Sequence, residues 1–311
     1  MRFVSKPYAT YIRSYGYFIA LIWMIMPMPY AIGASSIEIA FLEDTCDPRG
    51  FDNVYHTTVR MAFHSANNTW KSFEHFADNL DQLDSAAAKL DGHRQWFILD
   101  HDKLIGKVAS DGVHKYEWYK DIGTQKLLTS LPTKARELRT LKYSGWIGCP
   151  VRKPIVIASV LPSYDKESWR KEKTSYLPTQ EIVELLNKSV SELNQESDDQ
   201  SPKNKISKDN LISEEQYRSN NKDRLFAFKL RKKDSGTAIE EDLDNTLYWF
   251  YIGGNKRIIY IGRGLVLIDW ADYDADGQTE FLFWINGYNI NGYFLSWNSF
   301  EKNVSFTWSY H

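Results

Sequence analysis

The stretch of sequence that decides the fold is Leu265-Val-Leu-Ile-Asp-Trp-Ala-Asp-Tyr-Asp-Ala-Asp-Gly-Gln-Thr-Glu-Phe-Leu-Phe-Trp-Ile285. Its two ends, residues 265–268 and 281–285, are short apolar runs rich in β-branched and aromatic residues, and each lies close to turn residues. Such runs are typical of strands, because a helix needs a longer pattern with a period of 3.6 residues. The sequence therefore predicts two strands joined by an acidic turn.

The acidic turn offers five candidate ligands for one hard cation: the side chains of Asp272, Asp274, Asp276 and Glu280, and the backbone carbonyl of Gln278. Oxygen donors suit Ca2+, and Gly277 permits the sharp turn that lets them converge. With Asp269 just upstream, five carboxylates fall within residues 269–280, and they repel one another without a cation. We expect a structural Ca2+ site. The alternative is a solvated acidic turn, in which Asp276-Gly277 is present only because these residues readily adopt the backbone angles of the turn.

The spacing of the acids distinguishes this loop from an EF-hand. An EF-hand loop needs a bidentate Glu at its twelfth position and a helix on each side, whereas the twelfth residue here is Phe283 and the acid Glu280 stands ninth. The strand–loop–strand unit resembles the FG-GAP/VCBS repeat over roughly residues 264–286. The resemblance implies the calcium loop of integrin-type β-propellers and of many secreted bacterial proteins. The family usually has Asp at the ninth position, and only one copy is present.

The N-terminus has the pattern of a signal peptide over residues 1–33. A basic start without acids precedes an apolar run at 17–27, and small residues follow at 31–33 and 34–36, either of which suits signal peptidase. An uncleaved anchor is the alternative, although the run is shorter than the ~20 residues of a membrane span. Cleavage after Gly33 takes the net charge from −2 to −5, so we expect no nucleic-acid partner and no integral membrane span. The expected location is the periplasm or the extracellular space.

The cysteine count agrees with export. The chain has two cysteines, Cys46 and Cys149, both outside the signal. In an oxidising compartment such a pair favours a disulfide over two free thiols.

The remainder, residues 34–311, is predicted to be a single all-β or β-dominated domain of antiparallel hairpins and meanders. Aromatic residues make up 15% of the sequence, a bias that suits sheets. Hairpins are expected at Asn67-Asn68, at residues 100–103 and at Asn291-Gly292, and residues 304–310 alternate as a strand with one buried face. An irregular β-propeller is one arrangement that such strands can form, with an FG-GAP-like unit over residues 264–311.

Two segments depart from the strand pattern. Residues 72–92 have helix-compatible spacing, and residues 178–193 predict a helix whose N-cap is Thr179 or a neighbour. The next stretch, residues 194–223, is polar and poor in apolar residues. Its composition predicts a mobile insertion.

No catalytic machinery is recognisable. The seven histidines form no H-E-x-x-H motif, and the chain has no G-x-S-x-G elbow. The run Asp100-His101-Asp102 could bind zinc or support acid–base chemistry, but a polar hairpin tip explains it equally simply. Six aromatic residues beside the acidic loop could bind a ligand or fill a core, and core packing is the better explanation; they are Trp284, Tyr288, Tyr293, Trp297, Trp308 and Tyr310.

These features favour an exported, calcium-stabilised binding or interaction protein, with an unknown protein or glycan as its ligand. The alternative is a secreted hydrolase of glycans or lipids in which calcium is structural and the catalytic acids are unrecognised. A pocket that holds two carboxylates at glycosidase spacing would favour the hydrolase.

Overall fold

The computed structural model describes residues 37–46, 55–66, 69–73, 94–101, 103–113, 124–138, 142–144, 150–163, 166–173, 176–196, 206–230, 247–287 and 290–309. The chain divides into two compact units, Met1–Ser35 and Ser36–His311. All of the described residues belong to the second unit. The predicted signal peptide, residues 74–92 of the helix predicted over 72–92, and Cys149 lie outside the described residues, as does the side chain of Cys46; Ser72, at the start of that predicted helix, ends strand β3 instead.

The fold is β-dominated, as the sequence predicts. The described helices are α2 (Thr133–Leu138), α3 (Gln180–Glu196) and the short 3-10 helix η2 (Lys208–Asn210). The strands are β1 (Ile37–Cys46), β2 (Tyr55–Ala66), β3 (Thr69–Ser72), β4 (Arg94–Asp100), β5 (Lys103–Val113), β6 (Thr124–Leu127), β7 (Lys142–Ser144), β8 (Pro150–Arg152), β9 (Ile155–Ala158), β10 (Arg170–Lys171), β11 (Leu211–Arg218), β12 (Arg224–Leu230), β13 (Leu247–Ile252), β14 (Ile258–Arg263), β15 (Leu265–Ala271), β16 (Glu280–Gly287), β17 (Ile290–Trp297) and β18 (Lys302–Ser309).

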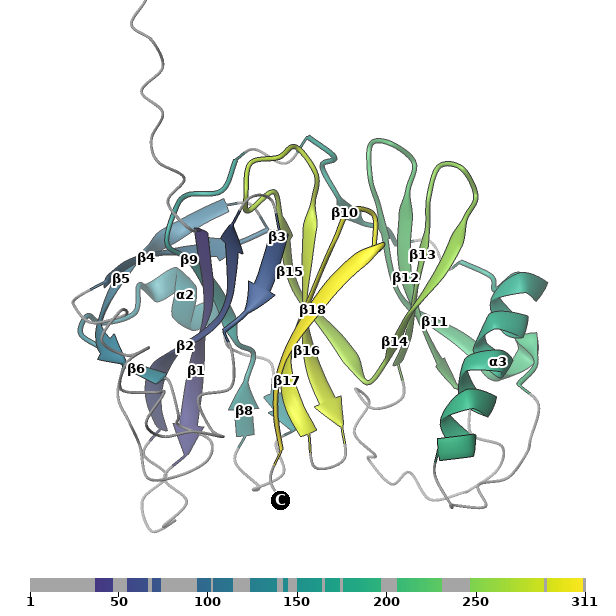
Figure 1. Cartoon of the computed structure of the whole chain (residues 1–311), viewed down its shortest axis with the longest axis horizontal. Helices are drawn as coiled ribbons and strands as arrows, with labels where there is room; N and C mark the ends of the chain where they lie inside the picture. Colours follow the sequence, from purple (N-terminus) through teal and green to yellow (C-terminus); the bar gives the residue numbers. More distant parts are fainter. Residues whose placement is uncertain are drawn as a thin grey trace, which may run out of the picture. The chain divides into compact units, whose positions relative to one another are not determined.

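The N-terminal strands close into a barrel. Six of them pair in the order β1-β9-β4-β5-β6-β2, β2 pairs back to β1, and β3 extends the sheet beyond β2 (Figure 1). Alternation along β1 sends Ala40 and Leu42 into one cluster with Trp96 of β4 and Ala135 of α2, which fills the barrel. The intervening residues Ile39 and Phe41 belong to a different cluster, on the outside of the barrel.

The C-terminal strands form two antiparallel meanders. The four-stranded sheet has the order β15-β16-β17-β18, and the five-stranded sheet has the order β10-β11-β12-β13-β14. One face of the four-stranded sheet packs on the outside of the barrel, where Phe41 stacks on Tyr293 with ring centroids 3.5 Å apart. The other face packs on the five-stranded sheet through Phe283 and Trp249, whose centroids are 5.3 Å apart. The far face of the five-stranded sheet is covered by α3 (Figure 1).

Burial of both faces explains why residues 281–284 are a continuous apolar run, since successive side chains of this segment belong alternately to the two cores. Adjacent propeller blades also pack face to face, as these two meanders do. The strands before them form a closed barrel instead, so a propeller does not describe the whole domain.

A β-bulge in β15 changes which of its side chains point to the same side of the strand. The pairing of β15 with β16 shifts between Leu267 and Asp269, which makes Ile268 an extra residue. Two consecutive side chains, Ile268 and Asp269, therefore line the same pocket beside the barrel.

The helix predicted over 178–193 is confirmed as α3. Thr179 precedes it, accepts a bond from the backbone N–H of Val183 through its carbonyl at 3.3 Å, and bonds the N–H of Ile182 through Oγ1 at 3.4 Å. None of the helices in the described ranges has the length and apolar content that crossing a membrane requires.

The mobile insertion predicted over 194–223 is wrong for most of its residues. Residues 194–196 end α3, and β11 pairs with β10 on one side and with β12 on the other. Polar residues suffice there because partners from outside the segment satisfy them: the Gln216 amide donates to Glu172 at 2.5 Å, and Lys171 lies over the Tyr217 ring. Residues 197–205 lie outside the described ranges.

Two of the three predicted turns are present and one is not. The hairpins at 66–69 and 100–103 are present, with Ala66 paired to Thr69 and Asp100 paired to Lys103. The turn predicted at Asn291-Gly292 is wrong, because both residues lie within β17 and pair with β18. Glycine is needed at 292 for another reason: a Cβ there would lie 2.3 Å from the carbonyl oxygen of Phe306.

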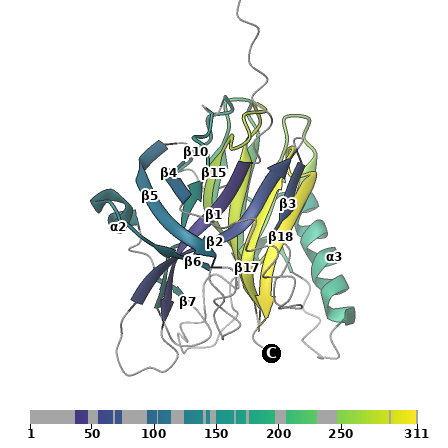
Figure 2. The same ribbon diagram turned by 60° about the vertical axis from the view of Figure 1, so that its left-hand side comes forward.

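The C-terminal order β16-β17-β18 is confirmed, and Trp308 shows what holds it. Its ring is partly buried, packs 5.7 Å from Trp284, and lies under the guanidinium of Arg60 in β2 at 4.5 Å. Beside it β18 lies next to β3 (Figure 2). Trp308 therefore joins the last strand to the barrel.

We expect Trp308→Ala to reduce the free energy of unfolding by about 2–3 kcal/mol, below the ~3–5 kcal/mol of a fully buried aromatic residue. Trp308→Phe, which keeps an aromatic ring, should cost less than half as much. Urea denaturation followed by circular dichroism measures both. A loss below about 0.5 kcal/mol for the alanine variant would contradict a packing role.

Candidate metal centre

The predicted calcium ligands lie in the connection between β15 and β16. Ala271 pairs with Glu280, so residues 272–279 form a loop closed by the ladder. The backbone carbonyl of Asp272 accepts a bond from the N–H of Ser163 at 3.1 Å, which ties the loop to a second segment of chain. Strands flank the loop on both sides, as the sequence predicts.

The loop turns through bonds from its backbone to its own carboxylates. The Gly277 N–H donates to Asp272 at 3.1 Å, the Asp276 N–H to Asp274 at 3.3 Å, and the Gln278 N–H to Asp276 at 2.8 Å. Gly277 has φ +89°, a conformation that glycine adopts without strain, as expected for the sharp turn. These bonds aim the three aspartates at a common point: one oxygen from each lies within 4.8 Å of the others.

Glu280 is the most informative of the predicted ligands. Its side chain is fully buried, and Oε2 accepts the Tyr273 N–H at 2.7 Å. The other oxygen, Oε1, is buried and has no hydrogen-bond partner among the described residues. Burial raises the pKa of Glu280 well above its ordinary value, and the charges of Asp274, Asp276 and Asp272 raise it further. Glu280 is therefore a buried carboxylate whose negative charge is opposed by the charges of three aspartates, and such a group needs either a proton or a cation.

Asp274 is perturbed in the same direction. Partial burial is the main cause of its raised pKa, and the charge of Asp276 adds to it. The indole of Trp70 in β3 lowers the pKa of Asp274, although its N–H makes no direct hydrogen bond within the described residues. The acidic loop therefore lies near β3, the strand that extends the barrel sheet, as well as at the end of its own sheet.

The structure does not test Gln278, whose predicted ligand is its backbone carbonyl. The residue is exposed, and both its backbone N–H and its side-chain amide donate to Asp276. Its role as a carbonyl ligand stays a prediction.

A second polar cluster lies near the loop, and only part of it was predicted from the sequence. His101 has φ +49° at the tip of the β4–β5 hairpin, and its ring stacks on Trp270 with centroids 3.7 Å apart. Its backbone N–H donates to Asp269 at 2.6 Å, and its Nδ1 lies 2.8 Å from the same Oδ1. The hairpin tip is thus anchored on β15, and its carboxylate partner comes from 168 residues away.

The same carboxylate links this cluster to the acidic loop. Tyr273 donates its hydroxyl to Oδ2 of Asp269 at 2.7 Å, and burial together with that neighbouring charge raises the pKa of Tyr273 well above its ordinary value. Asp269 is therefore held by donors from both the hairpin and the loop. No local motif could have revealed the pair, because it depends on the bulge at Ile268.

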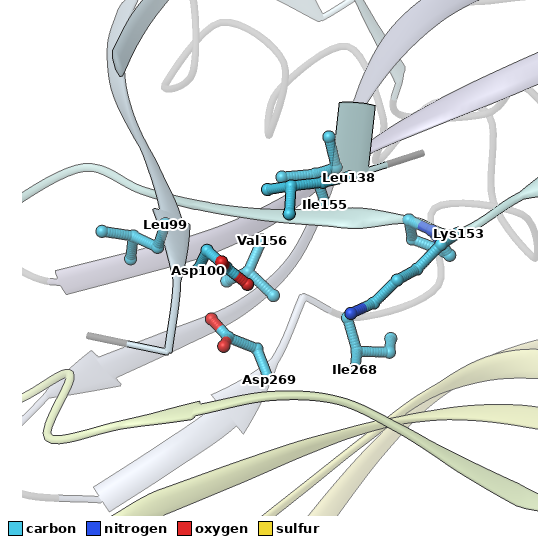
Figure 3. Close-up of a pocket in the computed structure, with 9 residues that line it drawn as sticks. Leu99, Asp100, Leu138, Lys153, Ile155, Val156, Ile268 and Asp269 are labelled. Carbon is cyan, nitrogen blue, oxygen red and sulfur yellow. The ribbon is translucent and has the colours of Figure 1, made fainter. Parts of the chain in front are cut away.

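A small pocket opens between these elements. Asp100 and Asp269 turn their carboxylates toward each other there, with the amino group of Lys153 farther along the wall (Figure 3). The empty volume is about 220 Å3, including space open to solvent. The other lining residues are mostly apolar: Leu99, Leu138, Pro154, Ile155, Val156 and Ile268.

The aromatic residues near the loop are largely core. Trp284, Tyr293 and Trp297 are buried, and Trp308 packs against them. Tyr288 and Tyr310 lie outside the described residues. The four described rings therefore form no exposed platform for a ligand.

No family model matches the chain, and neither a curated protein nor a solved structure shows similarity to it.

The acidic loop makes a prediction about pH. Without metal, Glu280 has a folded pKa above the unfolded value, so the native state binds more protons than the unfolded chain in the window above about pH 4.5. Stability of the metal-free protein should therefore fall as pH rises through that window. Glu280→Gln should flatten this dependence and raise the melting temperature near neutral pH. Thermal melts of resin-stripped protein from about pH 5 to pH 7 measure it; equal slopes for the two proteins would contradict it.

Proposed function

We propose that this chain is an exported binding or interaction protein whose loop 272–280 holds one structural Ca2+. Two observations carry the proposal: Asp272, Asp274 and Asp276 bring one carboxylate oxygen each within 4.8 Å of the others, and the buried Oε1 of the nearby Glu280 has no hydrogen-bond partner among the described residues. The resemblance of the loop to the FG-GAP/VCBS repeat supports the same assignment.

The donor set favours calcium over other metals. All of the loop's candidate ligands are oxygens, and four of them are carboxylates. Ca2+ takes 6–8 oxygen ligands in flexible geometry, whereas Mg2+ demands near-ideal octahedral geometry and transition metals favour nitrogen or sulfur. Waters would complete the coordination.

The position of the loop indicates a structural role. It lies where the four-stranded sheet meets the barrel extension, next to Trp70, and its backbone is bonded to Ser163. A cation there would fix the junction of three segments rather than present itself to a substrate. Binding and interaction are then left to the surface of the domain.

The test is thermal unfolding with and without calcium. Ca2+ at 100 times its Kd should add about 2.7 kcal/mol, which raises the melting temperature by about 5–10 °C for a domain of this size. EGTA should reverse the shift, and Asp274→Ala should remove most of it. Asp209→Ala, an acid on η2 outside the loop, is the matched control and should keep the full response. An identical melting curve with Ca2+ and with EGTA would refute the site.

Export predicts a disulfide between Cys46 and Cys149. Two residues a few positions from these cysteines are close in space, since Arg152 Nε lies 3.5 Å from Asp44 Oδ2. Non-reducing peptide mapping of protein secreted by its own signal should recover one linked peptide pair. Two alkylatable thiols in that material would contradict the prediction.

The hydrolase alternative has one observation in its favour, the pocket with Asp100 and Asp269. One oxygen of each lies within 4.8 Å of the other, near the ~5–5.5 Å between the carboxyl groups of retaining glycosidases. The enclosed cavity volume is, however, only about 10 Å3, far below the ~300–1,000 Å3 of organic ligand sites. Hydrolysis of chromogenic glycosides or esters that Asp100→Asn abolishes would favour the enzyme over the binding protein.

A further inference from the structure

We propose that Asp100, His101 and Asp269 form a second metal site, separate from the calcium loop, that binds a divalent transition metal such as Zn2+. One ligand atom from each of these residues lies within 4.8 Å of the others. The three come from two structural units, the β4–β5 hairpin of the barrel and β15 of the four-stranded sheet. The proposal does not depend on calcium binding at the loop.

The contact between His101 and Asp269 is the first argument. Nδ1 lies 2.8 Å from Oδ1, yet Nδ1 is buried with no hydrogen-bond partner among the described residues. With metal bonds of about 2.1 Å, two ligand atoms lie about 3.0 Å apart at 90° and about 3.4 Å apart at 109°. A metal ion would therefore fit this pair with a small adjustment.

The surroundings hold the donors in place, as second-shell groups do in metal sites. Tyr273 donates its hydroxyl to Oδ2 of Asp269, which leaves Oδ1 directed at the histidine. Trp270 stacks on the imidazole and fixes the plane of the ring. Asp269 itself is 2% exposed, so its charge is shielded from water and its pull on a cation is strong.

The donor set and the pocket indicate the class of metal. One imidazole and two carboxylates suit Zn2+ or Mn2+ better than Ca2+, which favours oxygen alone. Three protein ligands leave a coordination position open toward the pocket between Asp100 and Asp269 (Figure 3). The enclosed volume of about 10 Å3 is close to what one water molecule needs. Lys153, on the same wall, forms no ion pair with either carboxylate in the described part of the chain, so it leaves both available.

Zn2+ titration of the untagged, EDTA-stripped protein tests the site. Saturating Ca2+ is present throughout, so that the acidic loop does not compete. Calorimetry should show one Zn2+ per chain, and Co2+ should give a visible absorption band. His101→Asn, which tolerates positive φ, and Asp100→Asn should each weaken Zn2+ binding by roughly tenfold or more. Lys153→Met should strengthen it.

Two control variants separate this site from others. Asp274→Ala, in the acidic loop, and His64→Gln, in β2, should bind Zn2+ as the wild type does. Circular dichroism must show that the His101 and Asp100 variants are folded. Absence of Zn2+ binding by the wild type would overturn the proposal, and so would equal binding by the folded His101→Asn and Asp100→Asn variants. Loss in Asp274→Ala with retention in His101→Asn would place the zinc in the acidic loop and also overturn it.

Discussion

The structure depends on one constraint, that the four-stranded sheet β15–β18 is buried on both faces. The barrel covers one face, the five-stranded sheet covers the other, and α3 in turn covers the five-stranded sheet. Apolar burial stabilises a sheet by roughly 25 cal/mol per Å2, so two covered faces give these strands a large share of the core. Both candidate metal sites lie toward one end of this sheet, at Asp269 in the last part of β15 and in the loop that follows that strand.

The sequence predicted the parts of this fold that depend on local pattern. Strands flank the acidic loop, α3 begins after Thr179, and the last strands form a meander, because each follows from periodicity or from a cap. The predictions were wrong where the local structure depends on residues that are distant in sequence. Gly292 resembled a turn residue, but it is glycine because β18 passes too close for a side chain. β11 resembled an insertion, but its polar residues find partners in other segments.

The candidate sites differ in the same way. The spacing of Asp272, Asp274 and Asp276 is local, and the structure brings their oxygens together as expected. The cluster around Asp269 required a bulge in β15, a left-handed residue at His101 and the meeting of two sheets, none of which leaves a mark in the spacing of residues. The sequence placed Asp100 and Asp102 on either side of His101, and the structure adds Asp269; Asp102 lies outside the described residues.

The stacking of Phe41 on Tyr293 has a consequence for how the chain reaches its native state. These rings belong to β1 and β17, and the Tyr293 hydroxyl also bonds Glu43 across 250 residues of sequence. Contacts of such long range form slowly, because the loop between them must be ordered first. Until the last strands arrive, the outer face of the barrel exposes a broad apolar surface that can aggregate. The pairing of the last strands with the barrel is therefore the step that removes this surface from solvent.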